Sequence, residues 1–174
     1  QYFAEAGCAP DIMTTAKSIA AGMPISAVTA RAEIMDKVAP GTIGGTFGAN
    51  AMSAAAALKV IEIMERDDYP GKALHIAEKV RTAFDAWVDK YEVVGNVRGT
   101  GAMMGIEFVT DKETKTPNAA IVSAIVQEAM NNGLMLEAAG TYGNVIRFLC
   151  PLCATDAQLE AGIEIFENAL KACM

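Results

Sequence analysis

The chain has 174 residues, about the length of one domain, which argues against two large independent catalytic domains. Its residues are 52% hydrophobic and 20% charged, too apolar for a disordered protein, yet no uninterrupted apolar stretch reaches the roughly 18 residues of a membrane span. Twenty-one Asp and Glu against 14 Lys and Arg give a net charge of −7, and there is no basic run. This balance disfavours nucleic-acid binding.

The apolar composition also bears on assembly. A domain of this size buries only about 70% of the surface of its unfolded chain and must cover the rest with polar groups. We therefore expect part of the surface to face another chain, in a homodimer or higher homo-oligomer, or a missing piece of the same chain. Gln1 is not an initiator Met, and the first eight residues lack the basic and apolar regions of a signal peptide. We expect a cytoplasmic protein in which this chain begins inside a longer one.

The first part of the chain, residues 1–66, alternates short elements with loops. The expected elements are a strand or short helix from residue 11, a Gly-Pro turn at 22–24, a strand at 25–29, one or two helical turns at 32–37 and a glycine-rich loop at 40–48. Asn50 is a good N-cap for a helix over 51–66. Apolar or small side chains surround most of that helix, so we expect it to be covered on all sides.

The second part begins after the polar boundary at 67–71 and predicts a compact α+β unit. Its expected elements are an amphipathic helix over 72–91, strands over 93–98 and 102–109, a polar turn at 111–117, a helix over 119–131 capped by Asn118, strands over 134–137 and 144–150, and a final helix from Thr155 to about Cys173. This order predicts a small, mostly antiparallel sheet with helices on one face.

The four cysteines include Cys150 and Cys153, whose spacing is also found in metal and redox sites. A zinc site needs two more ligands at motif spacing, and the only histidine, His75, lies in a charged helical stretch. We therefore expect no metal site, and reduced, partly buried thiols as in a cytosolic protein.

Lys17 is the first candidate for chemistry, because it is the only charged residue between Ile12 and Ala30. Desolvation lowers the pKa of a lysine ammonium and makes the amine available as a nucleophile or a general base. The commoner explanation is a lysine that extends its ammonium into water from an apolar segment.

Arg147 has a similar setting, since it is the only charge between Ala138 and Ala154. In a strand it shares a face with Val145 and Leu149, so its guanidinium requires an anion, either a protein carboxylate or a ligand. Planar two-point capture of a substrate carboxylate is a common use of arginine, but a structural ion pair is the commoner one.

Thr46 follows two glycines in the loop before the capped helix. Backbone N–H groups and a hydroxyl suit phosphate oxygens, although a glycine-rich hinge before a helix explains the pattern as well.

Four ordered segments resemble the class III pyridoxal-phosphate-dependent aminotransferases. They are PDIMTTAKS at 10–18 with GMP at 22–24, GGTF at 44–47 with Asn50, VRGTG at 97–101 and YGNVIRFL at 142–149. Within that family the chain is similar to the gamma-aminobutyrate aminotransferases. The resemblance covers nearly the whole chain and implies the C-terminal part of an α/β, fold type I enzyme. Residues 1–66 would end the large cofactor-binding domain, and residues 67–174 would form the small α+β domain.

The resemblance also implies roles for the three candidates. Lys17 would form the internal aldimine with pyridoxal phosphate and move the proton between substrate and cofactor. Thr46 would hold the cofactor phosphate in the neighbouring subunit's site. Arg147 would bind the carboxylate of 2-oxoglutarate or glutamate, under the control of an upstream glutamate. Residues 47–51 depart from the family, with Phe47 for a common tyrosine and Gly-Ala-Asn-Ala for Ala-Gly-Asn-Pro.

The expected activity is transamination of an omega-amino acid such as 4-aminobutyrate with 2-oxoglutarate. The family's phosphate loop, ring-stacking aromatic and pyridine-nitrogen aspartate would precede Gln1, so we expect this chain alone to be inactive or nearly so. Two alternatives remain open. One is another class III aminotransferase acting on acetylornithine, ornithine or diaminobutyrate, and the other is a non-catalytic interaction module.

Overall fold

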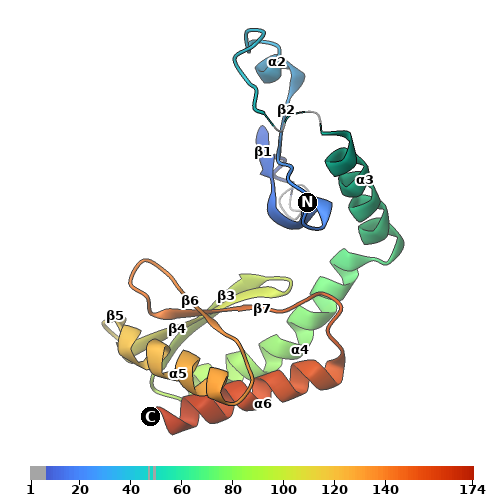
Figure 1. Cartoon of the computed structure of the whole chain (residues 1–174). Helices are drawn as coiled ribbons and strands as arrows, with labels where there is room; N and C mark the ends of the chain where they lie inside the picture. Colours follow the sequence, from blue (N-terminus) through green and yellow to red (C-terminus); the bar gives the residue numbers. More distant parts are fainter. Residues whose placement is uncertain (1–6, 47, 49) are drawn as a thin grey trace. The chain divides into compact units, whose positions relative to one another are not determined.

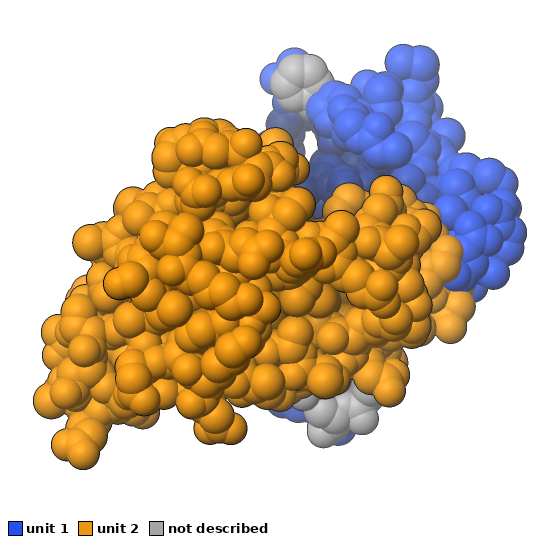
Figure 2. Space-filling model, turned by 90° about the horizontal axis from the view of Figure 1, so that it is seen from below, with its two compact units in different colours: residues 1–67 blue, residues 68–174 orange. Residues whose placement is uncertain are grey.

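The structure is a computed structural model that describes residues 7–46, 48 and 50–174. The chain divides into two compact units, residues 1–67 and residues 68–174, which Figure 2 colours separately. The division falls between Asp67 and Asp68, within the polar stretch that separates the two parts of the sequence.

The described part of unit 1 contains a two-stranded antiparallel sheet and three helical segments. Figure 1 labels β1, β2, α2 and α3. Strand β1 (Ile12–Thr15) pairs with β2 (Ala27–Ala30) from Ile12 opposite Ala30 to Thr15 opposite Ala27. The 3-10 helix η1 (Lys17–Ala20) lies in the connection between them, and the short helix α2 (Ala32–Met35) follows β2. Helix α3 (Ala51–Arg66) packs against η1.

The predicted helix over 51–66 is confirmed together with its cap. The backbone N–H of Ser53 donates to Oδ1 of Asn50 at 3.1 Å, which satisfies one of the free N–H groups of the first turn. We expected other segments to cover α3 on all sides. Within the described chain they do not, because Ser53 is the only buried residue of α3. Met52 and Leu58 are each 69% exposed, so apolar surface of this helix remains open.

Unit 2 is the predicted α+β layer (Figure 1). Its antiparallel sheet has the order β3-β4-β7-β6, and β5 pairs with the end of β4. The strands are β3 (Val94–Thr100), β4 (Met103–Asp111), β5 (Thr116–Pro117), β6 (Glu137–Ala139) and β7 (Val145–Leu149). The helices α4 (Tyr69–Lys90), α5 (Ala119–Asn131) and α6 (Asp156–Ala172) lie on one face of this sheet, and its other face is free of helices in unit 2.

Several element boundaries differ from the sequence prediction by a few residues, and the contacts explain two of these differences. Helix α4 begins at Tyr69 instead of residue 72, because Asp68 caps it by accepting a hydrogen bond from the N–H of Gly71 at 3.1 Å. Pro70 fits in the first turn of α4, because the backbone N–H that proline lacks has no partner inside the helix at that position. The strand predicted at 134–137 is wrong. Leu134 still donates to the carbonyl of Ala129 in the turn that ends α5, so β6 starts only at Glu137.

The core of unit 2 lies between the helices and the sheet. It contains an aromatic cluster in which the ring centroids of Phe84 and Trp87 are 4.9 Å apart and those of Trp87 and Phe166 are 5.1 Å apart. Leu159, Phe166 and Leu170 of α6 are buried, as its periodicity predicts. No helix in the described ranges is long and apolar enough to cross a membrane.

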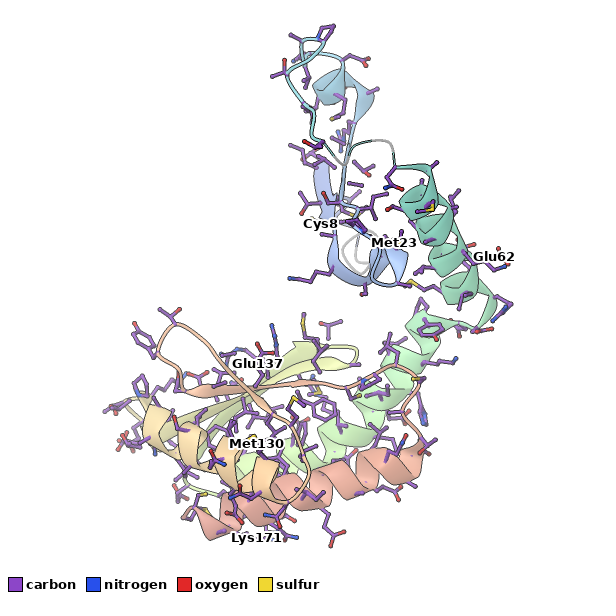
Figure 3. The ribbon with its side chains drawn as sticks, viewed as in Figure 1. Cys8, Met23, Glu62, Met130, Glu137 and Lys171 are labelled. Carbon is purple, nitrogen blue, oxygen red and sulfur yellow. The ribbon has the colours of Figure 1, made fainter. Side chains whose placement is uncertain are left out.

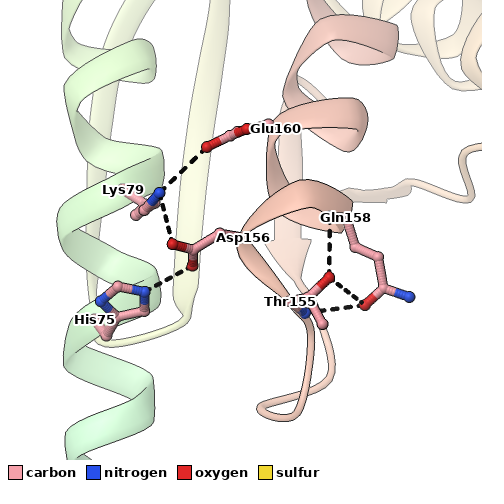
Figure 4. A network of polar contacts seen from close by, with 6 residues as sticks. All are labelled: His75, Lys79, Thr155, Asp156, Gln158 and Glu160. Atoms are coloured by element: carbon pink, nitrogen blue, oxygen red, sulfur yellow. Dashed lines mark hydrogen bonds and ion pairs between the residues drawn. The ribbon is translucent and has the colours of Figure 1, made fainter.

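Polar contacts fix the start of α6 against α4 (Figure 4). Thr155 and Gln158 form a reciprocal capping box, in which each side chain accepts a backbone N–H from the other residue. Asp156 accepts from Nε2 of His75 and from Nζ of Lys79, both at 2.8 Å. The hydrogen bonds from Lys79 and His75 hold the pKa of the Asp156 carboxyl below its usual value, and the bond from Lys79 has the larger effect.

Candidate functional site

Lys17 starts η1 immediately after β1, in an unusual backbone conformation. Its φ is 57°, in the left-handed region that costs a residue with a side chain about 1–2 kcal/mol. Ala16 before it is extended, so the chain turns sharply at Lys17. Strained backbone of this kind is concentrated at functional positions, where the surrounding structure maintains it.

The charges nearest to Lys17 in sequence neutralise each other. Nε of Arg31 lies 3.1 Å from Oδ1 of Asp11, and the N–H of Arg31 donates to the carbonyl of Asp11, so the two residues close the open end of the β1–β2 pair. Lys17 itself is exposed and makes no hydrogen bond or ion pair within the described ranges. Its side chain extends into water, which is the commoner of the two explanations for a lysine in an apolar segment, and its amine is open to a ligand.

Thr46 lies in an exposed turn of the glycine-rich loop. The N–H of Gly48 donates to the carbonyl of Gly45 at 2.9 Å, and space is open at the positions where Gly44 and Gly45 would carry a Cβ. Of the residues that depart from the family, Phe47 and Ala49 lie outside the described residues. No hydrogen bond joins Thr46 to Lys17 in the part of the chain that the structure describes.

Arg147 is the central residue of β7 and lies on the sheet face that carries no helix. Ile146 and Phe148 on either side of it are buried against the helices, whereas Arg147 shares the other face with Val145 and Leu149, as predicted. It lies opposite Gly105 of β4 on one side and Glu137 of β6 on the other.

The anion that Arg147 requires is supplied within the sheet. Nη2 of Arg147 donates to Oε2 of Glu137, which is labelled in Figure 3. Nε of Arg147 is shielded from solvent and has no hydrogen-bond partner among the residues that the structure describes. The two side chains are 40% and 64% exposed, so the ion pair lies in contact with water.

The sequence prediction placed a strand over 134–137 without assigning its register, so it did not identify Glu137 as the partner of Arg147. With the register known, Glu137 is directly opposite Arg147, and opposed side chains on one face of a sheet interact. A second pair on the same face joins Nη1 of Arg98 to Oε2 of Glu107.

The structure thus places Lys17 and Thr46 in unit 1 and Arg147 in unit 2. Lys17 and Thr46 are exposed, and the side chain of Arg147 is partly exposed. Cys150 and Cys153 are free thiols, and burial raises the pKa of Cys150. Among the described residues no group of three or more His, Cys, Asp or Glu could hold a metal ion.

Comparison with known proteins defines the class of this protein. The family model for class III aminotransferases matches residues 1–170, so the chain belongs to the class III aminotransferase family. It is 44% identical over 162 residues to the 5-aminovalerate aminotransferase DavT of Pseudomonas putida. It is 43% identical over 162 residues to the 4-aminobutyrate aminotransferase GabT of Escherichia coli. Each match covers 93% of this chain and 38% of the relative, so the chain spans well under half the length of these enzymes.

Solved structures show the same fold. An amine transaminase from an uncultivated Pseudomonas species, in its pyridoxal-phosphate-bound form, matches with a TM-score of 0.86 and 32% identity over 97% of this chain and 40% of that chain. A Bacillus anthracis aminotransferase matches with a TM-score of 0.87 and 27% identity over 98% of this chain and 40% of that chain. The predicted fold class, part of a fold type I transaminase, is confirmed.

Proposed function

We propose that the protein containing this chain is a pyridoxal-phosphate-dependent transaminase, and that Lys17 carries the cofactor. The observation on which this rests is the single lysine amine of the segment 12–30, which has no partner among the described residues and lies on a left-handed backbone. A free primary amine is the group that an aldehyde cofactor needs in order to be held covalently. The open turn at Thr46 fits the phosphate of such a cofactor, because it offers a hydroxyl beside unobstructed backbone.

Lys17, Thr46 and Arg147 have different roles in this reaction. Nζ of Lys17 holds the cofactor and, once the amino substrate has released it, carries a proton to and from the carbon that bears the substrate amine. The hydroxyl of Thr46 binds the cofactor phosphate in the site of a neighbouring subunit. The guanidinium of Arg147 binds a substrate carboxylate. The cofactor, when bound, supplies the electron sink for the carbon next to the amine.

For the substrates we propose an omega-amino acid donor, 4-aminobutyrate, with 2-oxoglutarate as acceptor. The similarity to the 4-aminobutyrate aminotransferase GabT supports the choice of donor, and the similarity to DavT supports 5-aminovalerate as a second donor of the same class. Both donors carry a terminal amine and a distant carboxylate. We further propose a homodimer or higher oligomer, which the exposed apolar residues of α3 support, and a cytoplasmic location.

The test is a transamination assay with the complete gene product. It should convert 2-oxoglutarate to glutamate with 4-aminobutyrate or 5-aminovalerate, and more slowly with ornithine, acetylornithine or diaminobutyrate. Preference for one of the last three would move the protein to another branch of the family. Absence of both turnover and Schiff-base absorbance after addition of pyridoxal phosphate would support the interaction-module alternative. This 174-residue chain alone should be inactive or nearly so.

A further inference from the structure

We propose that Glu137 competes with the substrate for Arg147 and so weakens the binding of carboxylate ligands at this position. This inference rests on the proposed role of Arg147 as a carboxylate-binding residue. It starts from the ion pair that joins the two side chains across β6 and β7 on the helix-free face of the sheet.

The geometry of the guanidinium limits how another carboxylate can reach it. A guanidinium offers two edges for two-point binding, one formed by Nε with Nη2 and the other by Nη1 with Nη2. Nε of Arg147 is shielded from solvent, so the first edge is closed. The second edge includes Nη2, which already donates to Glu137. An incoming carboxylate that binds this edge therefore meets a positive charge that Glu137 already partly neutralises.

Glu137 of β6 is the immediate anionic partner of Arg147, because the residue opposite Arg147 on β4 is not acidic. The opposite residue on β4 is Gly105, which has no side chain, and a Cβ there would lie 3.2 Å from Cγ1 of Val145. Glu107, two residues along β4, is engaged by Arg98. Both members of the Arg147–Glu137 pair are partly exposed, so the pair is weak enough for a ligand to exchange with Glu137.

The two glutamates provide a matched pair of variants. Glu137→Gln and Glu107→Gln each remove one negative charge from the same face of the same sheet and keep the shape of the side chain. Only Glu137→Gln removes the partner of Arg147. A general change in the electrostatic potential of this face would affect both variants alike, whereas competition for Arg147 would affect Glu137→Gln alone.

The experiment titrates the whole 174-residue chain with glutarate, an unreactive dicarboxylate, and follows the arginine side-chain N–H signals by NMR. The Arg147 signals, assigned from their loss in Arg147→Lys, should shift on titration, and Glu137→Gln should lower the Kd about two- to five-fold, the size expected for an exposed ion pair. Glu107→Gln should leave the Kd within about 1.5-fold of the parent chain, and Glu137→Asp should keep it closer to the parent value than Glu137→Gln does.

Two results would overturn the proposal in distinguishable ways. If glutarate shifts the Arg147 signals but Glu137→Gln binds no more tightly than Glu107→Gln, then Glu137 does not compete and only this inference fails. If glutarate shifts no Arg147 signal in the parent chain or in Glu137→Gln, then Arg147 is not a carboxylate site. In that case its role in the proposed function fails as well.

Discussion

Asn144 and Phe108 are joined by two hydrogen bonds across β4 and the start of β7. The N–H of Phe108 donates to the carbonyl of Asn144 at 2.7 Å, and Nδ2 of Asn144 donates to the carbonyl of Phe108 at 3.0 Å. Asn144 is buried, and it precedes Val145, the first residue of β7. The pair therefore fixes the point at which β7 enters the sheet, three residues before Arg147.

Replacing Asn144 with Ala should destabilise unit 2. The substitution removes the donor to Phe108 and leaves a small void in a buried position, which should lower the free energy of unfolding by about 1–3 kcal/mol. Urea unfolding of the whole chain measures this, with the exposed Asn96→Ala of β3 as a control. Equal stability of the two variants would show that the side chain of Asn144 does not hold the strand.

Glu167 should make the stability of unit 2 depend on pH. Lys90 and Tyr91 each donate to its Oε1 at 2.7 Å, and together with Lys171 they lower the pKa of Glu167 from 4.5 to about 2. Because the folded-state pKa is depressed, this stabilisation is complete above about pH 4.5 and is lost as the pH falls towards 2.

The test compares Glu167→Gln with the parent chain across that range. At pH 7 the variant should be less stable by on the order of 1–2 kcal/mol, since it loses charged hydrogen bonds that are partly screened by water. The difference should shrink as the pH approaches 2. Glu164→Gln, an exposed glutamate of the same helix, is the control. A difference that stays constant with pH would contradict the assignment.

Replacing Arg147 with Lys should impair the use of 2-oxoglutarate by the complete enzyme. Lysine keeps the charge but loses the planar fork, so transition-state binding should weaken by about 1.5–3 kcal/mol, which is roughly a ten- to hundredfold loss in kcat/KM. The half-reaction of an amine that has no carboxylate should change little. Unchanged kinetics with 2-oxoglutarate would leave Arg147 as a structural partner of Glu137.

The exposed apolar residues of α3 should make the 174-residue chain associate. Sedimentation is expected to show a dimer or higher species, because apolar surface that remains open in the chain favours burial against another copy. Leu58→Asp should shift the chain towards a monomer. Leu74→Asp, at a leucine of α4 that is 64% exposed, should not. A stable dilute monomer of the parent chain would argue against the proposed partner contact.

The sequence predicted those features that depend on local chemistry. Asn50, Asn118 and Thr155 each cap the helix expected after them, because a side-chain oxygen at this position satisfies a free N–H of the first turn. The buried face of α6 also follows from its apolar spacing.

The features that were missed depend on contacts between distant segments. The register that places Glu137 opposite Arg147 could not be read from a short strand that directly follows a helical turn. The sequence left open whether Lys17 is buried or exposed, because apolar neighbours along the chain do not show which side of it they cover. The left-handed backbone at Lys17 has no sequence signal, since the residue is not a glycine.

Mapping the lysine that carries the cofactor tests the role of Lys17. Borohydride reduction of the complete, cofactor-loaded enzyme fixes the pyridoxyl group to its lysine, and trypsin does not cut after a modified lysine. The account predicts one labelled peptide that contains an uncut Lys17 and ends at Arg31. Label on another lysine, or no label on an active enzyme, would contradict both the assignment of Lys17 and the proposed division of work among the residues of the site.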